Sequence, residues 1–427
     1  MINSELSSPP SAERPRRPLA RVLALVLGDD VAPSLWPILM ITLVSTATFT
    51  GVWSYAGVWA KTSVHASAAA VGVMFLSYAG GCGITGYVGG RLSDRFGRRR
   101  VMVGGWTLAS ALILTLPLVP GAAPVKLGWA VLAMAAGSPA TSASNTAVAD
   151  LAPAEEQERA YASSRVMFNI GSMLGPPMAG LVLLTHSWTL LFICAGVLGL
   201  ATVAIVLTWM PRTSPARNGK ADRRPAQGSR TGIWRDHPFV LLLASTLLGY
   251  FIYVTYSSVL PVVAVSDYHL APSAWGFIYA INPIIVVLFQ MRITRVTRTI
   301  SSSVKLTLAS LLMGVSFLIL LLLPNIVGVV LLTGAFVIGE MLWAPVSQSL
   351  AVRMAPEDER GSYMGAFRGS GQIAMGLAPF VMLWVHESGN TPTWITIGAI
   401  SVLAAGVGWV AAQKTRPRKE PAQENRT

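Results

Sequence analysis

Twelve long apolar runs, separated by short polar connections, constrain the fold of this 427-residue chain more than any other feature. An α-helix needs about 20 apolar residues to cross the hydrocarbon core of a bilayer, and each run is close to that length. Only 12% of the residues are charged, whereas a soluble globular domain has about 25%. The sequence therefore predicts an all-α membrane protein and argues against a soluble enzyme, a disordered scaffold or a secreted disulfide-linked module. The expected spans are residues 35–60, 70–90, 101–120, 127–149, 160–184, 188–210, 238–264, 273–291, 304–323, 326–350, 361–384 and 392–412.

The distribution of basic residues supports this number of spans. If the chain crosses the membrane at every expected span, all but two of its 32 Lys and Arg residues fall on one side, and only Lys61 and Lys126 remain for the other. Cytoplasmic loops carry an excess of Lys and Arg, so we expect a multi-pass protein of the cell membrane with both termini in the cytoplasm. A net charge of +13 is also found in proteins that bind nucleic acid. Here the basic residues punctuate apolar runs, so contacts with the lipid bilayer are the better interpretation and no nucleic-acid partner is expected.

The longest polar interval, residues 211–237, divides the chain into six spans and six. It is rich in Arg, Pro, Gly and Ser, which is typical of a flexible linker. An internal repeat indicates that the halves are equivalent: Pro153 and Pro356 each follow Ala and begin an acidic run that ends in Arg. Transporters are often built from such duplicated halves. The expected units are a cytoplasmic N-terminal segment (1–34), an N-terminal six-helix bundle (35–210), a cytoplasmic linker (211–237), a C-terminal six-helix bundle (238–412) and a cytoplasmic tail (413–427).

The connection between the second and third spans has the sequence GRLSDRFGRRR, from Gly90 to Arg100. A basic loop on the cytoplasmic side accounts for its arginines, but not for Asp94 or for its two glycines. The stretch resembles the G-x-L-x-D-R-x-G-R-R signature of the major facilitator superfamily, and the core from 35 to 412 fits the two six-helix bundles of that fold. The resemblance implies a conformational latch, in which Asp94 faces the start of the eleventh span and Arg98 reaches Asp150. The latch residues it implies are Gly90, Asp94, Arg95, Gly97, Arg98 and Asp150.

The fifth span combines small residues with two prolines. Small residues let helix backbones approach closely, so helix packing alone is a sufficient explanation. The pattern also resembles the antiporter motif G-x3-G-P-x2-G-G of the drug:proton antiporter branch, and this resemblance favours an exporter over an importer. The sequence departs from the motif at Ala179, and at Ser163 an upstream glycine is missing. The residues that match are Gly171, Gly175, Pro176 and Gly180.

Glu340 lies near the middle of the tenth span, deeper than any other carboxylate in the sequence. An ionisable side chain inside a membrane is costly and usually faces a cavity or a partner. Burial favours the protonated form of a carboxyl group, which makes Glu340 the candidate for proton coupling, or for binding a cation. Its surroundings resemble the same region of bacterial drug:proton antiporters and of peptide:proton symporters. A structural Glu, tied to a neighbouring Arg or hydroxyl, is the alternative.

Aromatic and amide residues at mid-span positions are candidates for lining a substrate cavity, although interfacial belts and ordinary packing explain most aromatics in membrane proteins. Tyr250, Tyr253 and Ser257 have the spacing of one helical stripe. Arg165 and Arg368 lie about two turns into their spans, where snorkelling, a latch contact with Asp150 and anion binding all remain open. The cavity candidates are Trp53, Tyr55, Asn145, Asn169, Tyr250, Tyr253, Asn282, Gln290 and Trp343.

Catalytic signatures are missing from the sequence: it contains no HExxH, Walker A or GxSxG motif, and its five histidines lack the spacing of metal ligands. We therefore expect no enzyme, no metal and no cofactor, with the proton gradient as the energy source. The predicted function is a secondary active transporter, monomeric, that exports amphipathic small molecules (drugs or metabolites) in exchange for protons. A proton-coupled importer of a nutrient or peptide, and a non-transporting membrane sensor, are the alternatives.

Overall fold

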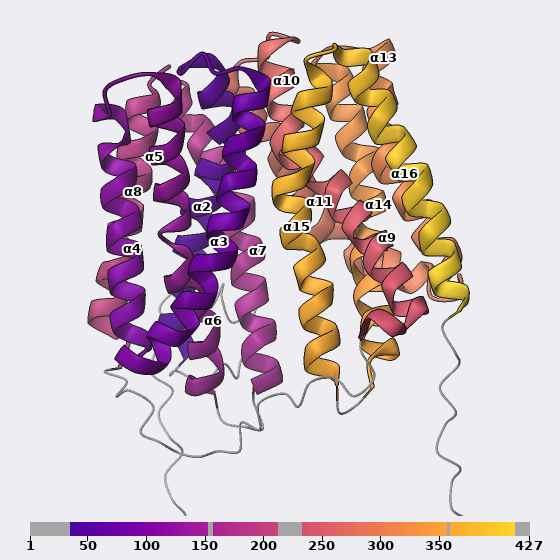
Figure 1. Cartoon of the computed structure of the whole chain (residues 1–427), viewed down its shortest axis with the longest axis horizontal. Helices are drawn as coiled ribbons and strands as arrows, with labels where there is room; N and C mark the ends of the chain where they lie inside the picture. The colour runs from indigo at the N-terminus through magenta and orange to yellow at the C-terminus, as the bar shows by residue number, and fades with distance from the viewer. Residues whose placement is uncertain (1–34, 153–156, 212–232, 357–358, 415–427) are drawn as a thin grey trace, which may run out of the picture.

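The computed structural model describes residues 35–152, 157–211, 233–356 and 359–414, and within these ranges the regular structure is entirely helical. Figure 1 shows two groups of helices side by side, the indigo-to-magenta N-terminal half and the rose-to-yellow C-terminal half. The N-terminal half contains α2 (Trp36–Thr62), α3 (Ala68–Phe96), α4 (Arg98–Thr115), η2 (Leu116–Leu118), α5 (Ala123–Ala135), α6 (Ser138–Leu151), α7 (Gln157–Leu183) and α8 (Trp188–Trp209). The C-terminal half contains η4 (Ile233–Arg235), α9 (His237–Val254), η5 (Thr255–Val259), α10 (Leu260–Ser266), α11 (Pro272–Val296), α12 (Ser302–Val315), η6 (Ser316–Leu318), α13 (Ile319–Leu322), α14 (Ile326–Met354), α15 (Arg360–His386) and α16 (Asn390–Gln413).

Ten helices of the described residues are long and apolar enough to cross a membrane by themselves. The fourth expected span falls short because it is broken into α5 and α6 at Ala136 and Gly137. Pro139, near the start of α6, lacks the N–H that would continue the helix from α5. The eleventh span, α15, has the length but carries many polar and glycine residues. Both nevertheless pack as full members of the bundles, with α5 and α6 on α3 and α4, and α15 on α3 and α9. The predicted all-α membrane fold of twelve spans is confirmed.

Local sequence explains where several of these helices begin. The first N–H groups of a helix have no partner within the helix, and a Ser side chain at the N-cap supplies one. Ser67 caps α3 in this way, and Ser187 and Ser301 cap α8 and α12. Between α3 and α4 the chain turns at Gly97, whose φ of 87° is a conformation that glycine adopts at little cost. The second glycine of the loop signature therefore has a conformational role.

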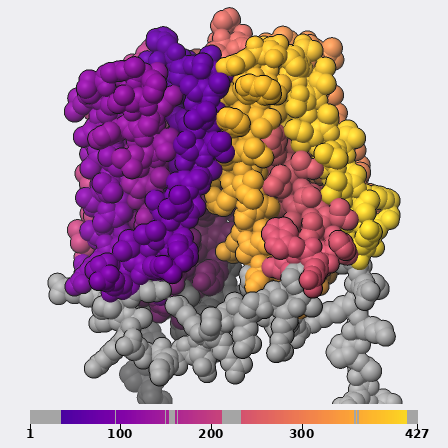
Figure 2. All heavy atoms as spheres, viewed as in Figure 1, coloured from indigo at the N-terminus to yellow at the C-terminus, as the bar shows by residue number. Residues whose placement is uncertain are grey.

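The two halves touch mainly at one end of the molecule. We call the end where α2 begins and α16 ends the arginine-rich end, and the other the opposite end. Near the opposite end, a Cβ on Gly57 of α2 would lie 2.6 Å from Val262 of α10, and a Cβ on Gly72 of α3 would lie 2.9 Å from the Cα of Phe380 in α15. In Figure 2 the halves are in contact above and hollowed between them further down. The halves are thus closed together at the opposite end and separate toward the arginine-rich end.

Candidate functional site

Glu340 lies at the centre of α14, and its carboxyl group contacts α11. Asn282 donates from Nδ2 to Oε2 of Glu340 over 2.6 Å. The Asn282 side chain is buried, whereas Glu340 is half-buried. Among the described residues no Lys, Arg or His forms an ion pair with Glu340. An amide therefore holds the carboxyl group, and no fixed cation neutralises it.

Tyrosines surround this carboxyl group. Tyr253 of α9 and Tyr279 of α11 lie close to each other, and both are within electrostatic range of Glu340. We call Tyr253, Tyr279, Asn282 and Glu340 the carboxyl cluster. Three of these residues are candidates from the sequence, and Tyr279 is not among them. Its spacing could have identified it, because Tyr279 precedes Asn282 by three positions and so lies on the same face of α11.

A change in helix geometry accompanies the cluster. Residues Thr255–Val259 form the π-helical turn η5 between α9 and α10. Such turns are rare and occur frequently at functional sites. The expected stripe assumed regular spacing through Ser257, but Ser257 is buried and donates to the carbonyl of Val254. The stripe therefore consists of Tyr250 and Tyr253 only.

Tyr250 extends the polar lining from the carboxyl cluster toward the arginine-rich end. Its ring meets the Trp343 indole edge-on, with 4.8 Å between ring centroids. Trp343 is one turn from Glu340 on α14 and is buried, with its indole packed on Gly249. The Tyr250 ring also lies against Gly371 of α15. Tyr250 thus joins α9, α14 and α15.

The cavity candidates of the N-terminal half lie on α2, α6 and α7. Trp53 is buried against Phe75 and Tyr78 of α3. Tyr55 points to the other side of α2, since two positions along a helix differ by about 200°, and its hydroxyl donates to the carbonyl of Pro176 over 3.4 Å. Both side chains are engaged in helix packing. Asn145 of α6 and Asn169 of α7 are exposed. Gln290, a candidate of the C-terminal half, lies on α11 and donates to the carbonyl of Met341.

The loop signature between α3 and α4 is attached to α6. Arg98 forms an ion pair with Asp150, and its Nη1 donates to Oγ of Ser93 over 3.2 Å. Arg95 is exposed, and Gly90 has no neighbour where a Cβ would lie. The Arg98–Asp150 pair lies within the N-terminal half and does not join the two halves. The side chain of Asp94, which the resemblance places at the latch, lies outside the described residues.

The small residues of α7 permit two close helix contacts. A Cβ on Gly171 would lie 2.6 Å from the carbonyl oxygen of Leu43 in α2, and Gly175 is equally close to that helix. A Cβ on Gly180 would lie 2.8 Å from the carbonyl oxygen of Ser273, which belongs to the other half. The carbonyl of Pro176 likewise lies against α11. The motif residues therefore pack α7 on α2 and, at the opposite end, on α11.

A polar cluster that sequence reasoning missed ties three helix ends together at the opposite end. Asp267, just after α10, pairs with Nε2 of His386 over 3.3 Å and accepts from Nδ2 of Asn390 over 3.0 Å. Burial raises the pKa of Asp267, but hydrogen bonds from its neighbours, led by His386, outweigh burial and lower the pKa to about 2. The carboxylate is therefore ionised at neutral pH and holds the ends of α10, α15 and α16 in place.

Glu387, next to this cluster, bridges the halves: its Oε1 accepts from the backbone N–H of Ala69 in the first turn of α3 over 3.0 Å. A carboxylate at a helix N-terminus stabilises by about 0.3–1 kcal/mol, so Glu387→Ala is expected to raise the population open at this end by about two- to fivefold. The measurement is the rate at which a thiol reagent labels the side chain introduced by Phe380→Cys, in a chain from which Cys82 and Cys194 have been removed. Glu387→Gln keeps a side-chain oxygen that can accept from Ala69 but removes the negative charge, so its labelling rate should lie between those of the wild type and Glu387→Ala. An unchanged labelling rate in Glu387→Ala contradicts the role of this contact.

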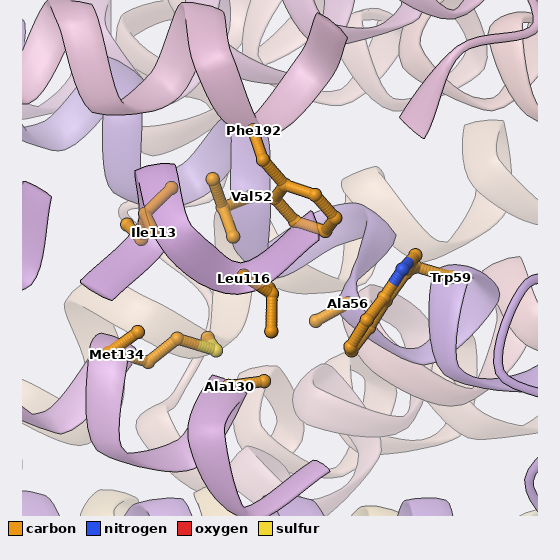
Figure 3. Close-up of a pocket in the computed structure, with 9 residues that line it drawn as sticks. Val52, Ala56, Trp59, Ile113, Leu116, Ala130, Met134 and Phe192 are labelled. Atoms are coloured by element: carbon orange, nitrogen blue, oxygen red, sulfur yellow. The ribbon is translucent and has the colours of Figure 1, made fainter. Parts of the chain in front are cut away.

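Figure 3 shows a small pocket that lies apart from these residues, inside the N-terminal half among α2, α4, η2, α5 and α8. Its lining is apolar, and it contains no charged side chain. It shares no residue with the carboxyl cluster. The lining residues are Val52, Ala56, Trp59, Ile113, Leu116, Ala130, Ala133, Met134 and Phe192.

Twelve spans in two bundles, with a carboxyl group at the centre of α14 that forms no ion pair within the described residues, are the architecture of a polytopic membrane transporter. A family model described as Major Facilitator Superfamily matches residues 38–379. The chain therefore belongs to the major facilitator superfamily, whose members are transporters and not enzymes.

Relatives and solved structures agree with this assignment. The chain is 24% identical over 343 residues to the multidrug resistance protein MdtH of Escherichia coli (strain SE11), covering 78% of this chain and 83% of that protein. MdtH of Salmonella typhimurium (strain LT2) shows the same identity and coverage. A POT family transporter in complex with 5-aminolevulinic acid superposes with a TM-score of 0.74 at 15% identity, over 90% of this chain and 96% of that one. A bacterial homolog of the human lysosomal transporter Spinster, in an inward-facing and occupied conformation, gives 0.71 at 12% identity, over 90% and 98%.

Proposed function

We propose that this transporter exports amphipathic small molecules in exchange for protons, by alternating access. The arginine-rich end faces the cytoplasm in this proposal, because Lys and Arg accumulate on the cytoplasmic side of membrane proteins. The contacts between the halves then lie on the outer side, and the arrangement is open inward. The units 35–210 and 238–412 rock against each other, and residues 211–237 connect them. The protein works as a monomer in the cell membrane.

The observation that carries the proposal is the state of Glu340: mid-membrane, half-buried, held by Asn282 and without a cationic partner among the described residues. A neutral carboxyl group costs far less in apolar surroundings than a carboxylate, so protonation favours closure of the halves around it. The proton is taken up when the site faces outward and released when it faces the cytoplasm. A membrane potential adds about 2.3 kcal/mol per charge per 100 mV, and no cofactor is needed.

Two features support export over import. The span-five pattern resembles the antiporter motif, and the relatives described above are named multidrug resistance proteins. Proton-coupled import is the second candidate, since several structural neighbours are POT family and peptide transporters. Those neighbours share the fold at low identity. Among the charged residue types, α2 contains only Lys61, so it lacks the paired acidic and basic residues that the peptide symporters use in this region.

The loop signature contributes a latch in this proposal. Asp94 approaches the start of α15 when the arginine-rich end closes, where the helix N-terminus carries about half a positive charge. The Arg98–Asp150 pair holds the turn between α3 and α4 in position for that contact. Breaking the latch would favour the inward-open arrangement.

Efflux from energised vesicles tests the proposal. Inverted membrane vesicles that contain the protein are expected to accumulate ethidium when their interior is acidified, and to release it when a protonophore is added. Vesicles without the protein are the control. Ethidium movement that ignores the protonophore would refute proton coupling, and movement only in the opposite direction would favour the importer.

A further inference from the structure

Two arginines, one in each half, lie at the same number of residues from the start of their helices. Arg165 lies eight residues into α7 and Arg368 eight residues into α15, which places each about 12 Å along its helix. Guanidinium groups stay protonated in proteins. Within the described residues neither arginine forms an ion pair. Unpaired charges at such depth in a membrane protein are costly and usually mark a functional site.

Both side chains are exposed in the structure, and Arg165 is directed toward the other half. Arg165 donates from Nη1 to Oε1 of Gln348 over 3.4 Å, and Gln348 lies on α14 in the other half. Arg368 is one turn from Gly371, which abuts the Tyr250 ring. Both guanidinium groups lie within electrostatic range of the Tyr250 hydroxyl. Snorkelling toward lipid headgroups would direct the two side chains away from the partner half. The contact between Arg165 and Gln348 is not compatible with snorkelling of Arg165.

The arginines and the carboxyl cluster are two ends of one lining. Along α14, Gln348 is eight residues from Glu340, or about 12 Å. The Tyr250 and Trp343 rings fill the interval between them. From the arginine-rich end inward, the lining is first cationic, then aromatic and then acidic. This lining is complementary to a molecule that has an acidic group at one end, a flat apolar body and a basic or hydrogen-bonding group at the other.

We propose that Arg165 and Arg368 form an oxyanion subsite, and that the favoured substrates are amphipathic molecules with a carboxylate or phosphate group. This inference rests on the proposed function, because it names the substrate class of the same site. The oxyanion is supplied by the substrate and not by a lipid headgroup. Arg165 and Arg368 belong to different halves, so the two arginines reach one anion together when the halves enclose it.

Equilibrium binding of two matched dyes to the purified full-length protein tests the subsite without relying on transport. Rhodamine 110 has a free carboxylate where rhodamine 123 has a methyl ester, and the rest of the two molecules is the same. Fluorescence anisotropy is expected to show at least fivefold tighter binding of rhodamine 110. Arg165→Gln and Arg368→Gln should each remove this preference, while the affinity for rhodamine 123 stays the same or rises. Arg353→Gln is the matched control, because Arg353 bonds to Ser302 at the end of α14, away from the lining.

Equal binding of the two dyes, binding of neither, or a preference that survives both substitutions would overturn the subsite. Repeating the measurement in phosphatidylcholine and in phosphatidylglycerol nanodiscs distinguishes the source of the oxyanion. A preference that is equal in both lipids supports a substrate site, and one that phosphatidylglycerol abolishes shows that lipid headgroups occupy the arginines. Vesicle transport of rhodamine 123 separates this inference from the proposed function: proton-dependent transport without a binding preference leaves the exporter intact and refutes the subsite alone.

Discussion

Glu340→Gln is expected to lower transport driven by a pH gradient at least tenfold, while the protein remains folded in the membrane. Gln has almost the same shape as Glu, and its Oε1 can still accept the hydrogen bond from Asn282 that Glu340 accepts over 2.6 Å. It does not bind and release a proton near neutral pH, so the cycle loses its coupling. The measurement is gradient-driven dye transport in proteoliposomes, together with gel filtration of the purified variant as the test of folding.

Exchange of dye across the membrane without a gradient is expected to continue in Glu340→Gln, because it needs no net proton movement. Glu387→Gln is the matched control: it removes a carboxylate at the opposite end and should retain most of the gradient-driven transport. Asn282→Leu keeps the carboxyl group and removes its donor, and should reduce the rate without abolishing proton dependence. Gradient-driven transport at the wild-type rate in Glu340→Gln would place proton coupling on another residue.

Gly175→Leu is expected to prevent the formation of a stable N-terminal half. A Cβ at Gly175 would lie 2.3 Å from Oγ1 of Thr50 and 2.4 Å from the carbonyl oxygen of Ala47, and part of this contact is backbone that cannot rotate away. Overpacking of a core costs about 1–3 kcal/mol even for small additions, and a Leu side chain must separate α7 from α2. The expected result is a melting temperature lower by 10 °C or more, on the order of several kcal/mol, or loss of the monodisperse peak in gel filtration.

Gly104→Leu is the matched control, since Gly104 in α4 is exposed and has nothing within 4 Å of the position of a Cβ. Leucine there would face lipid and favours helix more than glycine does, so stability should be unchanged or higher. Gly175→Ala is expected to lie between the two variants. A Gly175→Leu protein as stable as the wild type would mean that α2 and α7 do not pack as closely as the structure shows.

Single residues of the site could be selected from the sequence, but their partners could not. Glu340 was identified because a carboxylate at the middle of an apolar run is rare, which is a property of one segment. Asn282 was selected for the same reason, as an amide at mid-span, yet nothing in either segment indicates that the two side chains meet. Tyr55 shows the opposite outcome: its mid-span position predicted a cavity role, whereas the structure packs it against Pro176.

The number of spans and their order follow from the sequence alone, because the length of an apolar run is a local quantity. The rotation of each helix about its axis is not local. Apolar residues cover every side of a membrane helix, so their pattern does not show which side faces lipid and which faces a neighbour. The tertiary structure alone decided that Asn282 holds Glu340, that Glu387 reaches α3, and that Arg165 reaches Gln348 in the other half. These contacts join residues far apart in the chain, and only the packing of twelve helices brings them together.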